Sequence, residues 1–232
     1  TQYTDSSKKQ LTTTLTSMTD DTDITAKFTD QNFKKEIYKV VNKAEGTPIL
    51  ISDVKKIKEL NIAYSGIQSL NGIEYFQRLE VLNCQGNNIT NLDLDCNIKL
   101  KTLTATDNKL TSINVNHACN LDSVDISNNA LSSLDVSNNK YLSSLTCTNN
   151  NIKVLDVTKN NMLKKLDCEE NRLTTLDVSK NKDLEYFKCC NNELKTLYDF
   201  SERFDEYSYM TQYTNQNHDY TSDDLTITIK NN

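Results

Sequence analysis

The feature that most constrains this chain is a gapless internal repeat of 21 residues. Six such units follow one another, and each begins at a leucine: Leu79, Leu100, Leu121, Leu142, Leu163 and Leu184. A 22-residue unit over residues 57–78 precedes them in the same phase. A fixed period in this range is typical of a solenoid, in which every repeat forms one coil and buries its apolar side against its neighbours. The repeat therefore predicts a stack of seven coils.

The apolar positions inside each unit have the spacing of a strand that buries one face. Positions 1, 4 and 6 are apolar, and the step from position 4 to position 6 is the period of a strand. In the third unit this spacing occurs twice, ten residues apart: Leu121, Val124 and Ile126, then Leu131, Leu134 and Val136. Ten residues cannot hold a helix of several turns and its two connections, so we predict a second extended segment on the far side of each coil. The fold class is therefore a leucine-rich-repeat solenoid, a right-handed superhelix of mainly parallel β-strands.

Position 9 of every 21-residue unit is an asparagine: Asn87, Asn108, Asn129, Asn150, Asn171 and Asn192. The apolar pattern places this column inside the coil, where an amide group must be hydrogen-bonded. We expect the stacked asparagines to bond the backbone of their own turn and of the adjacent coil.

The two ends of such a stack need caps, because the terminal coils would otherwise expose their apolar interior. Asp30 is expected to N-cap a helix over residues 31–41, and Ser52 or Asp53 to cap a short turn over residues 54–57. The predicted apolar face of the helix consists of four residues: Phe33, Ile37, Val40 and Val41.

We expect four segments: a Thr/Ser-rich N-terminal segment, a helical N-terminal cap, the repeats and a C-terminal cap, over residues 1–23, 24–56, 57–204 and 205–232. The first segment has the composition of a disordered chain, although Leu11, Leu15 and Met18 allow a weak amphipathic helix. In the last segment, residues 225–229 alternate and predict a closing strand. The aromatic residues between Tyr198 and Tyr213 are expected to cover the last coil.

The chain has seven cysteines, so at least one is unpaired within it. Position 6 holds four of them: Cys84, Cys147, Cys168 and Cys189. Other units have an apolar residue at position 6, and a free cysteine packs like a small hydrophobe. No CxxC spacing is present and neither histidine is in phase, so we predict buried free thiols and no metal. Cys190, at position 7, is expected to be exposed, with a pKa lowered slightly by Lys188.

A second column of short polar side chains occupies position 15: Asp93, Asn114, Asp135, Asp156 and Asp177. Stacked carboxylates could bind calcium, but calcium-binding repeats are rich in glycine and this chain has four. Bonding to nearby backbone N–H groups explains the column without a metal. We favour the backbone interpretation and predict no cofactor.

The candidate binding surface is the concave outward face of the first strand set, at positions 3, 5 and 7. Its residues are Val81, Asn83, Gln85, Thr102, Thr104, Thr106, Asp125, Ser127, Thr146, Thr148, Lys165, Asp167, Glu169, Tyr186 and Lys188. These side chains suit many shallow hydrogen bonds, as a glycan or a polar protein surface would offer. Aromatic anchors of the kind that dominate tight interfaces are few; Tyr64 and Tyr186 are the candidates.

Charge and composition exclude several functions. The net charge of −6 with three arginines offers no basic stripe for nucleic acid. The chain has no run of about 18 apolar residues, so we predict that it does not insert into a membrane. The chain has no catalytic triad motif, phosphate loop or metal cluster, so we predict that it is not an enzyme.

Three segments resemble the start of the internalin family of bacterial surface proteins: FTDQNFKKEIYKVV at 28–41, PILISDVKKIKEL at 48–60 and LNGIEYFQRL at 70–79. The units with cysteine at position 6 are most similar to the internalins that carry a cysteine column, and the resemblance extends over residues 24–200. It implies a secreted or wall-attached adhesin of a Gram-positive bacterium that binds a host protein or a mucin-type glycan. We expect a monomer. The alternative is a structural spacer or cell-wall assembly element with no external ligand.

Overall fold

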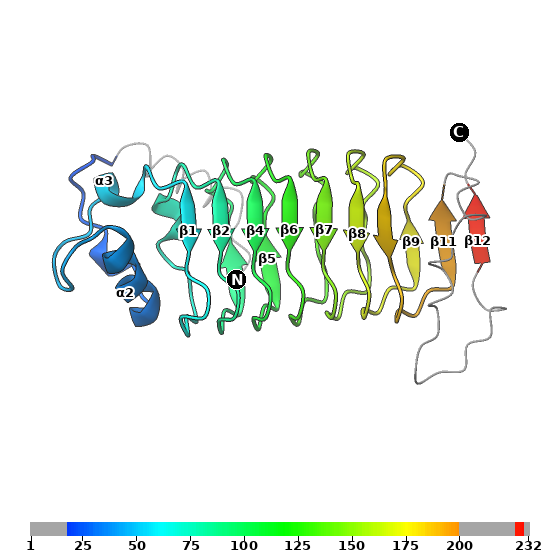
Figure 1. Ribbon diagram of the computed structural model, residues 1–232, viewed down its shortest axis with the longest axis horizontal. Coiled ribbons are helices and arrows are strands. Elements are labelled where there is room, and N and C mark those ends of the chain that lie inside the picture. Colours follow the sequence, from blue (N-terminus) through cyan, green and yellow to red (C-terminus); the bar gives the residue numbers. More distant parts are fainter. Residues whose placement is uncertain (1–17, 200–225, 230–232) are drawn as a thin grey trace.

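The computed structural model describes residues 18–199 and 226–229. A small helical part precedes a single stack of coils (Figure 1). Each of the seven coils contributes one strand to a parallel seven-stranded sheet. The strands, in their order across the sheet, are β1 (Glu59–Asn61), β2 (Val81–Asn83), β4 (Thr102–Thr104), β6 (Ser123–Asp125), β7 (Ser144–Thr146), β8 (Lys165–Asp167) and β10 (Tyr186–Lys188). Position 4 of one coil pairs with position 4 of the next, as Leu82 does with Leu103. The predicted leucine-rich-repeat solenoid is confirmed.

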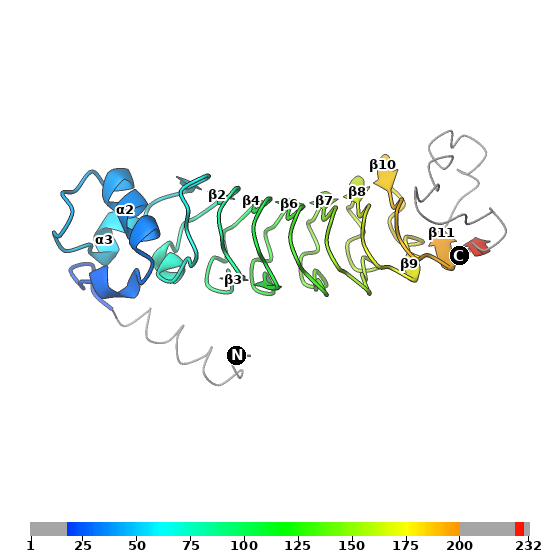
Figure 2. The ribbon, with the colours of Figure 1, turned by 90° about the horizontal axis from the view of Figure 1, so that it is seen from below.

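The far side of the stack is also extended, as predicted. Five short strands lie there: β3 (Asn91–Asp93), β5 (Ser112–Asn114), β9 (Thr175–Asp177), β11 (Thr196–Asp199) and β12 (Thr226–Ile229). The third and fourth units are joined on this side by a single bridge between Leu134 and Leu155. The 22-residue unit has one 3-10 turn instead, η2 (Ile73–Tyr75). Seen from below, the two strand sets lie on opposite sides of the stack (Figure 2).

One apolar core runs through the stack because every coil supplies the same inward columns. In the third unit all six predicted positions are buried: Leu121, Val124, Ile126, Leu131, Leu134 and Val136. Burial of a Leu or Val side chain stabilises by about 1.5–3 kcal/mol. Stacking therefore supplies the stability that a single coil could not provide alone.

The asparagine column at position 9 makes the predicted contacts with two coils. Asn150 Nδ2 donates to the carbonyls of Ile126 in the preceding coil and of Cys147 in its own, both at 3.1 Å. Its Oδ1 accepts from Leu131 N at 3.0 Å. The other five asparagines repeat this pattern, with their Oδ1 atoms 2.9–3.0 Å from the equivalent N–H groups.

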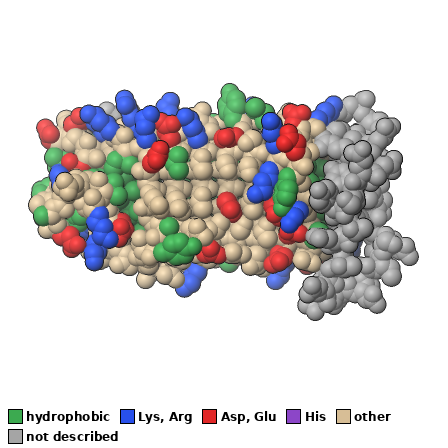
Figure 3. Space-filling view, viewed as in Figure 1, with side chains coloured by type: hydrophobic (Ala, Val, Ile, Leu, Met, Phe, Trp, Pro, Cys, Tyr) green, Lys and Arg blue, Asp and Glu red, His purple; other side chains and the backbone are tan. Residues whose placement is uncertain are grey.

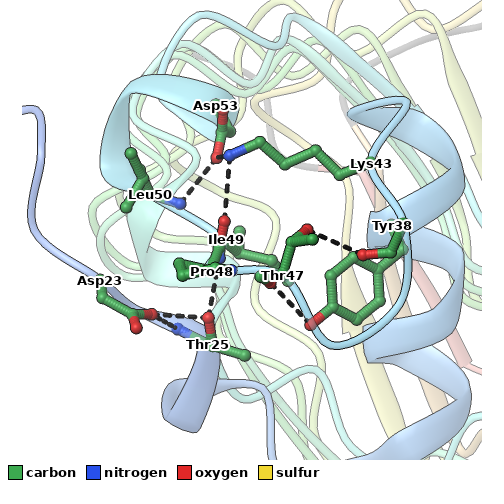
Figure 4. Close-up of polar contacts among 10 residues, drawn as sticks. Asp23, Thr25, Tyr38, Lys43, Thr47, Pro48, Ile49, Leu50 and Asp53 are labelled. Carbon is green, nitrogen blue, oxygen red and sulfur yellow. Dashed lines mark hydrogen bonds and ion pairs between the residues drawn. The ribbon is translucent and has the colours of Figure 1, made fainter.

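The N-terminal end is covered by a small helical cap. It contains η1 (Thr25–Lys27), α2 (Gln31–Val40) and α3 (Ile51–Val54). Asp30 N-caps α2 as predicted, with Oδ1 2.9 Å from Phe33 N. The prediction of an apolar face at Val40 is wrong, because Val40 is 42% exposed. The buried arc of α2 is rotated toward Tyr38, whose hydroxyl donates to Thr47 O at 3.0 Å (Figure 4).

The second helix of the cap begins earlier than predicted. α3 begins at Ile51, before both Ser52 and Asp53, so neither residue is its N-cap. Asp53 instead lies in the first turn, where its carboxylate accepts from Leu50 N at 2.7 Å and pairs with Lys43 Nζ at 2.5 Å (Figure 4). Lys43 also donates to Pro48 O at 3.0 Å, so one side chain holds the loop between the helices at two points.

The predicted closing strand is present at the other end. β12 pairs in parallel with β11, with Thr226 opposite Thr196. Leu225 and the aromatic residues from Phe200 to Tyr213 lie outside the described residues, as do Leu11 and Leu15. None of the helices in the described ranges combines the length and apolarity that a bilayer crossing requires.

Candidate binding surface

The outward face of the seven-stranded sheet is shallow and mostly uncharged (Figure 3). Neighbouring coils lie about 4.8 Å apart, so each side chain on the face is partly covered by the side chains of adjacent coils. Most of the predicted binding residues are half-buried, and Tyr186 is the one exposed residue among them. Thr106 and Asp167 are only 8% and 9% exposed. The face therefore offers mainly the tips of its side chains to a ligand.

Charged groups gather at the C-terminal end of this face. The Nζ atoms of Lys165 and Lys188 lie 5.4 and 5.6 Å from the centre of the Tyr186 ring. Lysines at such distances are attracted to the ring by about 0.5–1 kcal/mol at exposed sites. Lys188 also lies 3.5 Å from Glu169, and its pKa is above the ordinary value because of Tyr186 first and Glu169 second. The Tyr186 ring thus positions the ammonium groups of two lysines on the surface.

Hydrogen bonds along the face fix its acidic side chains. Asp125 Oδ1 accepts from Ser127 N at 3.1 Å and from Ser127 Oγ at 2.8 Å. Asp167 Oδ1 accepts from Thr148 Oγ1 of the preceding coil at 2.8 Å. The carboxylates are therefore oriented before any ligand arrives, which lowers the entropic cost of binding.

The cysteine column is buried in the core, as predicted. Cys84, Cys147, Cys168 and Cys189 are all buried, and Cys84, Cys147 and Cys168 are free thiols. Burial raises the pKa of Cys84 and of Cys147 to about 12. The prediction for Cys190 is wrong: it is 8% exposed, and burial raises its pKa to about 11 despite Lys188 nearby. The side chain of Glu169, at the same position of the preceding coil, interacts with the Cys190 thiol. Thr106, also at position 7, is buried as well.

The column at position 15 bonds the backbone, as favoured from the sequence. All five side-chain oxygens accept from the N–H group two residues later, at 2.9–3.2 Å. The pKa of Asp135 is lowered, first by the Ser137 hydroxyl and then by its backbone N–H. Among the described residues, no group of three or more His, Cys, Asp or Glu side chains has a geometry that could hold a metal ion.

Apart from Tyr64, sequence reasoning missed one row of exposed residues, at position 8. We call this row the rim: Tyr64, Gly86, Asp107, Asn128, Asn149, Glu170 and Asn191. Every member has a left-handed backbone, with φ between 52° and 67°, and all but the half-buried Gly86 are exposed. The available signal was the column of Gly, Asn and Asp, which are the residues that tolerate positive φ.

The rim side chains are joined to one another. Gln85 Nε2 donates to Asp107 Oδ2 at 3.0 Å, and Asn128 Nδ2 donates to Asp107 Oδ1 at 2.7 Å. Asn149 Nδ2 donates to Asn128 Oδ1 at 3.0 Å. These bonds lower the pKa of Asp107, through Gln85 first and Asn128 second. The rim is thus an ordered row of planar polar groups along the edge of the strand face.

Known structures resemble this stack of coils. The functional domain of InlJ from Listeria monocytogenes, described as including a cysteine ladder, is 25% identical, with a TM-score of 0.51, over 77% of this chain and 52% of that one. An internalin, InlF, from the same species is 24% identical, with a TM-score of 0.62, over 78% of this chain and 65% of that one. A leucine-rich-repeat protein from Leptospira interrogans is 25% identical, with a TM-score of 0.59, over 63% of this chain and 40% of that one.

No protein-family model and no curated protein matches the chain. The chain spans about half the length of the InlJ domain. Its fold is nevertheless similar to that of these internalins over most of its own length. By this architecture, the chain is an internalin-like leucine-rich-repeat protein.

Proposed function

We propose that the chain is a non-enzymatic binding module at a bacterial surface, secreted or wall-attached, whose strand face binds a host protein or a mucin-type glycan. The observation that carries this proposal is the ordered polar face, which ends in the Tyr186 cluster with Lys165 and Lys188. The similarity to internalins supports the choice of a binding module, and the family resemblance supports a Gram-positive source.

The chemistry of the face suits weak contacts spread over several coils. Each net hydrogen bond contributes about 0.5–1.5 kcal/mol, so side chains from several coils must contact the ligand together to hold it. The charged cluster adds an attraction that salt screens, because the Debye length is about 8 Å at physiological ionic strength. Binding should therefore be extended over the face and partly salt-dependent.

The test is retention of the purified chain on mucin-coated and host-cell surfaces at two salt concentrations. Lys188→Ala should weaken retention modestly, and Tyr186→Ala more strongly because it releases both lysines. The matched controls, Asp156→Ala and Thr158→Ala, change polar residues on the far side and should leave retention unchanged. Retention that survives loss of Tyr186 and Lys188 but disappears with the far-side changes would place the site on the other face. No retention on any surface would favour the structural spacer.

A further inference from the structure

Tyr64 occupies a place in the coil that does not suit a tyrosine. It lies on the rim with φ 54°, and it is 71% exposed. The equivalent residues of the next coils are Gly, Asp and Asn, which accept a left-handed backbone more readily than a bulky aromatic residue does. Neither burial of the ring nor backbone preference explains a tyrosine here. Unfavourable backbone conformations of this kind concentrate at functional sites.

The next coil is shaped to accept the Tyr64 ring. A Cβ atom built on Gly86 would lie 2.2 Å from Tyr64 Cδ1 and 2.3 Å from Cε1. Gly86 is therefore the residue that lets the ring lie against the neighbouring backbone, and it is the sole glycine on the rim. The ring is supported on one side and open to solvent over most of its surface, which is the geometry of a stacking platform.

Planar polar groups continue from this platform along the rim. Gln85, Asp107 and Asn128 are linked by hydrogen bonds of 3.0 and 2.7 Å and are held in place by them. With coils about 4.8 Å apart, Tyr64 and Asn128 are separated by three steps, or about 14 Å. The rim row from Tyr64 to Asn149 contains no basic residue and no second aromatic residue. The site is thus long, narrow and neutral to acidic.

We propose that Tyr64, the rim residues Asp107 and Asn128, and the adjoining Gln85 bind a linear chain of hexose units. The C–H face of a pyranose ring packs on the open face of an aromatic side chain. Pairs of neighbouring hydroxyls match the paired donors and acceptors of amides and carboxylates. The repeat of an extended hexose chain is close to the spacing between coils, so successive sugars meet successive rim residues. This site rests on the proposed role as a binding module and lies outside the face cluster at Tyr186.

Two substitutions test the platform. Tyr64→Asn places at position 8 the residue found at Asn128 and Asn149. It should raise the melting temperature by about 2–4 °C, on the scale of 1 kcal/mol for a chain of this size, while weakening sugar binding roughly tenfold. Gly86→Asn keeps a residue that accepts φ 67° but displaces the ring, so binding should fall to the same extent with Tyr64 still present. Asn191→Gly, at the far end of the rim, is the matched control and should bind as the wild type does.

The probes are soluble β-1,4-linked glucose and N-acetylglucosamine oligomers of two to six units, measured by titration calorimetry, with melting temperatures recorded for every variant. Affinity should increase with length up to about the four units that reach Asn128. The proposal is overturned if no oligomer binds the wild type, if binding survives both substitutions, or if Tyr64→Asn lowers the melting temperature. Host-cell retention that depends on Tyr186 but occurs without sugar binding would remove this site and leave the proposed function standing. Loss of both host-cell retention and sugar binding would overturn both this site and the proposed function.

Discussion

Asp30 Oδ2 accepts a hydrogen bond from the backbone N–H of Gln68 at 2.7 Å, which joins the helical cap to the first coil. The same oxygen accepts from Ser69 N at 3.2 Å, while Oδ1 caps α2 at Phe33. One carboxylate therefore satisfies three backbone donors on two parts of the chain. Asp30 therefore fixes the cap against the first coil of the stack.

Asp30→Ala should destabilise the chain by about 2–3 kcal/mol, because it removes an N-cap and leaves two further donors unpaired. Chemical denaturation with two-state analysis measures the change in the free energy of unfolding. Asp183→Ala, an exposed aspartate between two coils, is the control and should cost less than about 0.5 kcal/mol. Equal costs would show that the cap contributes nothing to the stability of the coils.

Core and face positions should differ in how much stability an alanine substitution costs. Leu166→Ala and Leu134→Ala should each cost about 2–5 kcal/mol as buried truncations, with the fully enclosed Leu166 the larger. Thr146→Ala should cost less than about 1 kcal/mol, because its side chain reaches water. Similar losses for Thr146 and Leu166 would contradict the assignment of inward and outward positions.

A second set of buried asparagines lies on the far side of the stack, at Asn97, Asn139, Asn160 and Asn181, and it should contribute less to stability than the column at position 9. Asn150 bonds through both ends of its amide. Asn160, on the far side, donates to Val136 O and Asn139 O, but its Oδ1 has no hydrogen-bonding partner among the described residues. Asn150→Ala leaves a buried N–H group unpaired, at a cost of about 1–3 kcal/mol. It should therefore destabilise more than Asn160→Ala, and the reverse order in denaturation curves would refute this assignment.

Thiol labelling should distinguish one cysteine from the buried column. Cys119 is the exposed thiol of the seven and should react with a polar maleimide in the native state. Cys147 and Cys190 should be protected, because burial raises their pKa to about 12 and about 11 and leaves little thiolate near pH 8. Mass spectrometry of labelled peptides gives the order of reaction. Cys119→Ser should abolish rapid labelling, and rapid labelling of Cys190 would contradict its burial.

Acid should weaken one surface cluster in a defined pH window. Glu80 lies between Lys58 and Lys101, at 2.9 and 2.7 Å, and their hydrogen bonds lower its pKa from 4.5 to about 2. A lowered carboxyl pKa stabilises the folded chain above pH 4.5, and this contribution is lost as the pH falls from 4.5 toward 2. The stability difference between wild type and Glu80→Gln should therefore be constant near neutrality and shrink within that window. A difference that does not change with pH would mean that Glu80 is not coupled to the lysines.

The sequence by itself determined the length of each coil and which of its residues point inward. A 21-residue period with a two-residue step between positions 4 and 6 allows only one assignment of inward and outward positions. The inward apolar columns, the asparagine column at position 9 and the cysteine column could therefore be predicted from the sequence. The Asp30 cap and the closing strand could also be predicted, because each depends on a few consecutive residues.

Only the tertiary structure decided which side chains are buried or in contact where coils and loops pack against one another. Alternation along a strand places Cys190 outward, yet it is buried and interacts with Glu169 of the adjacent coil. The helical period places Val40 inward, yet Tyr38 is drawn to the loop at Thr47 instead. The contact of Tyr64 with Gly86 joins residues 22 positions apart and exists only because adjacent coils stack in register. Such contacts depend on the distance between coils, which no local pattern of residues encodes.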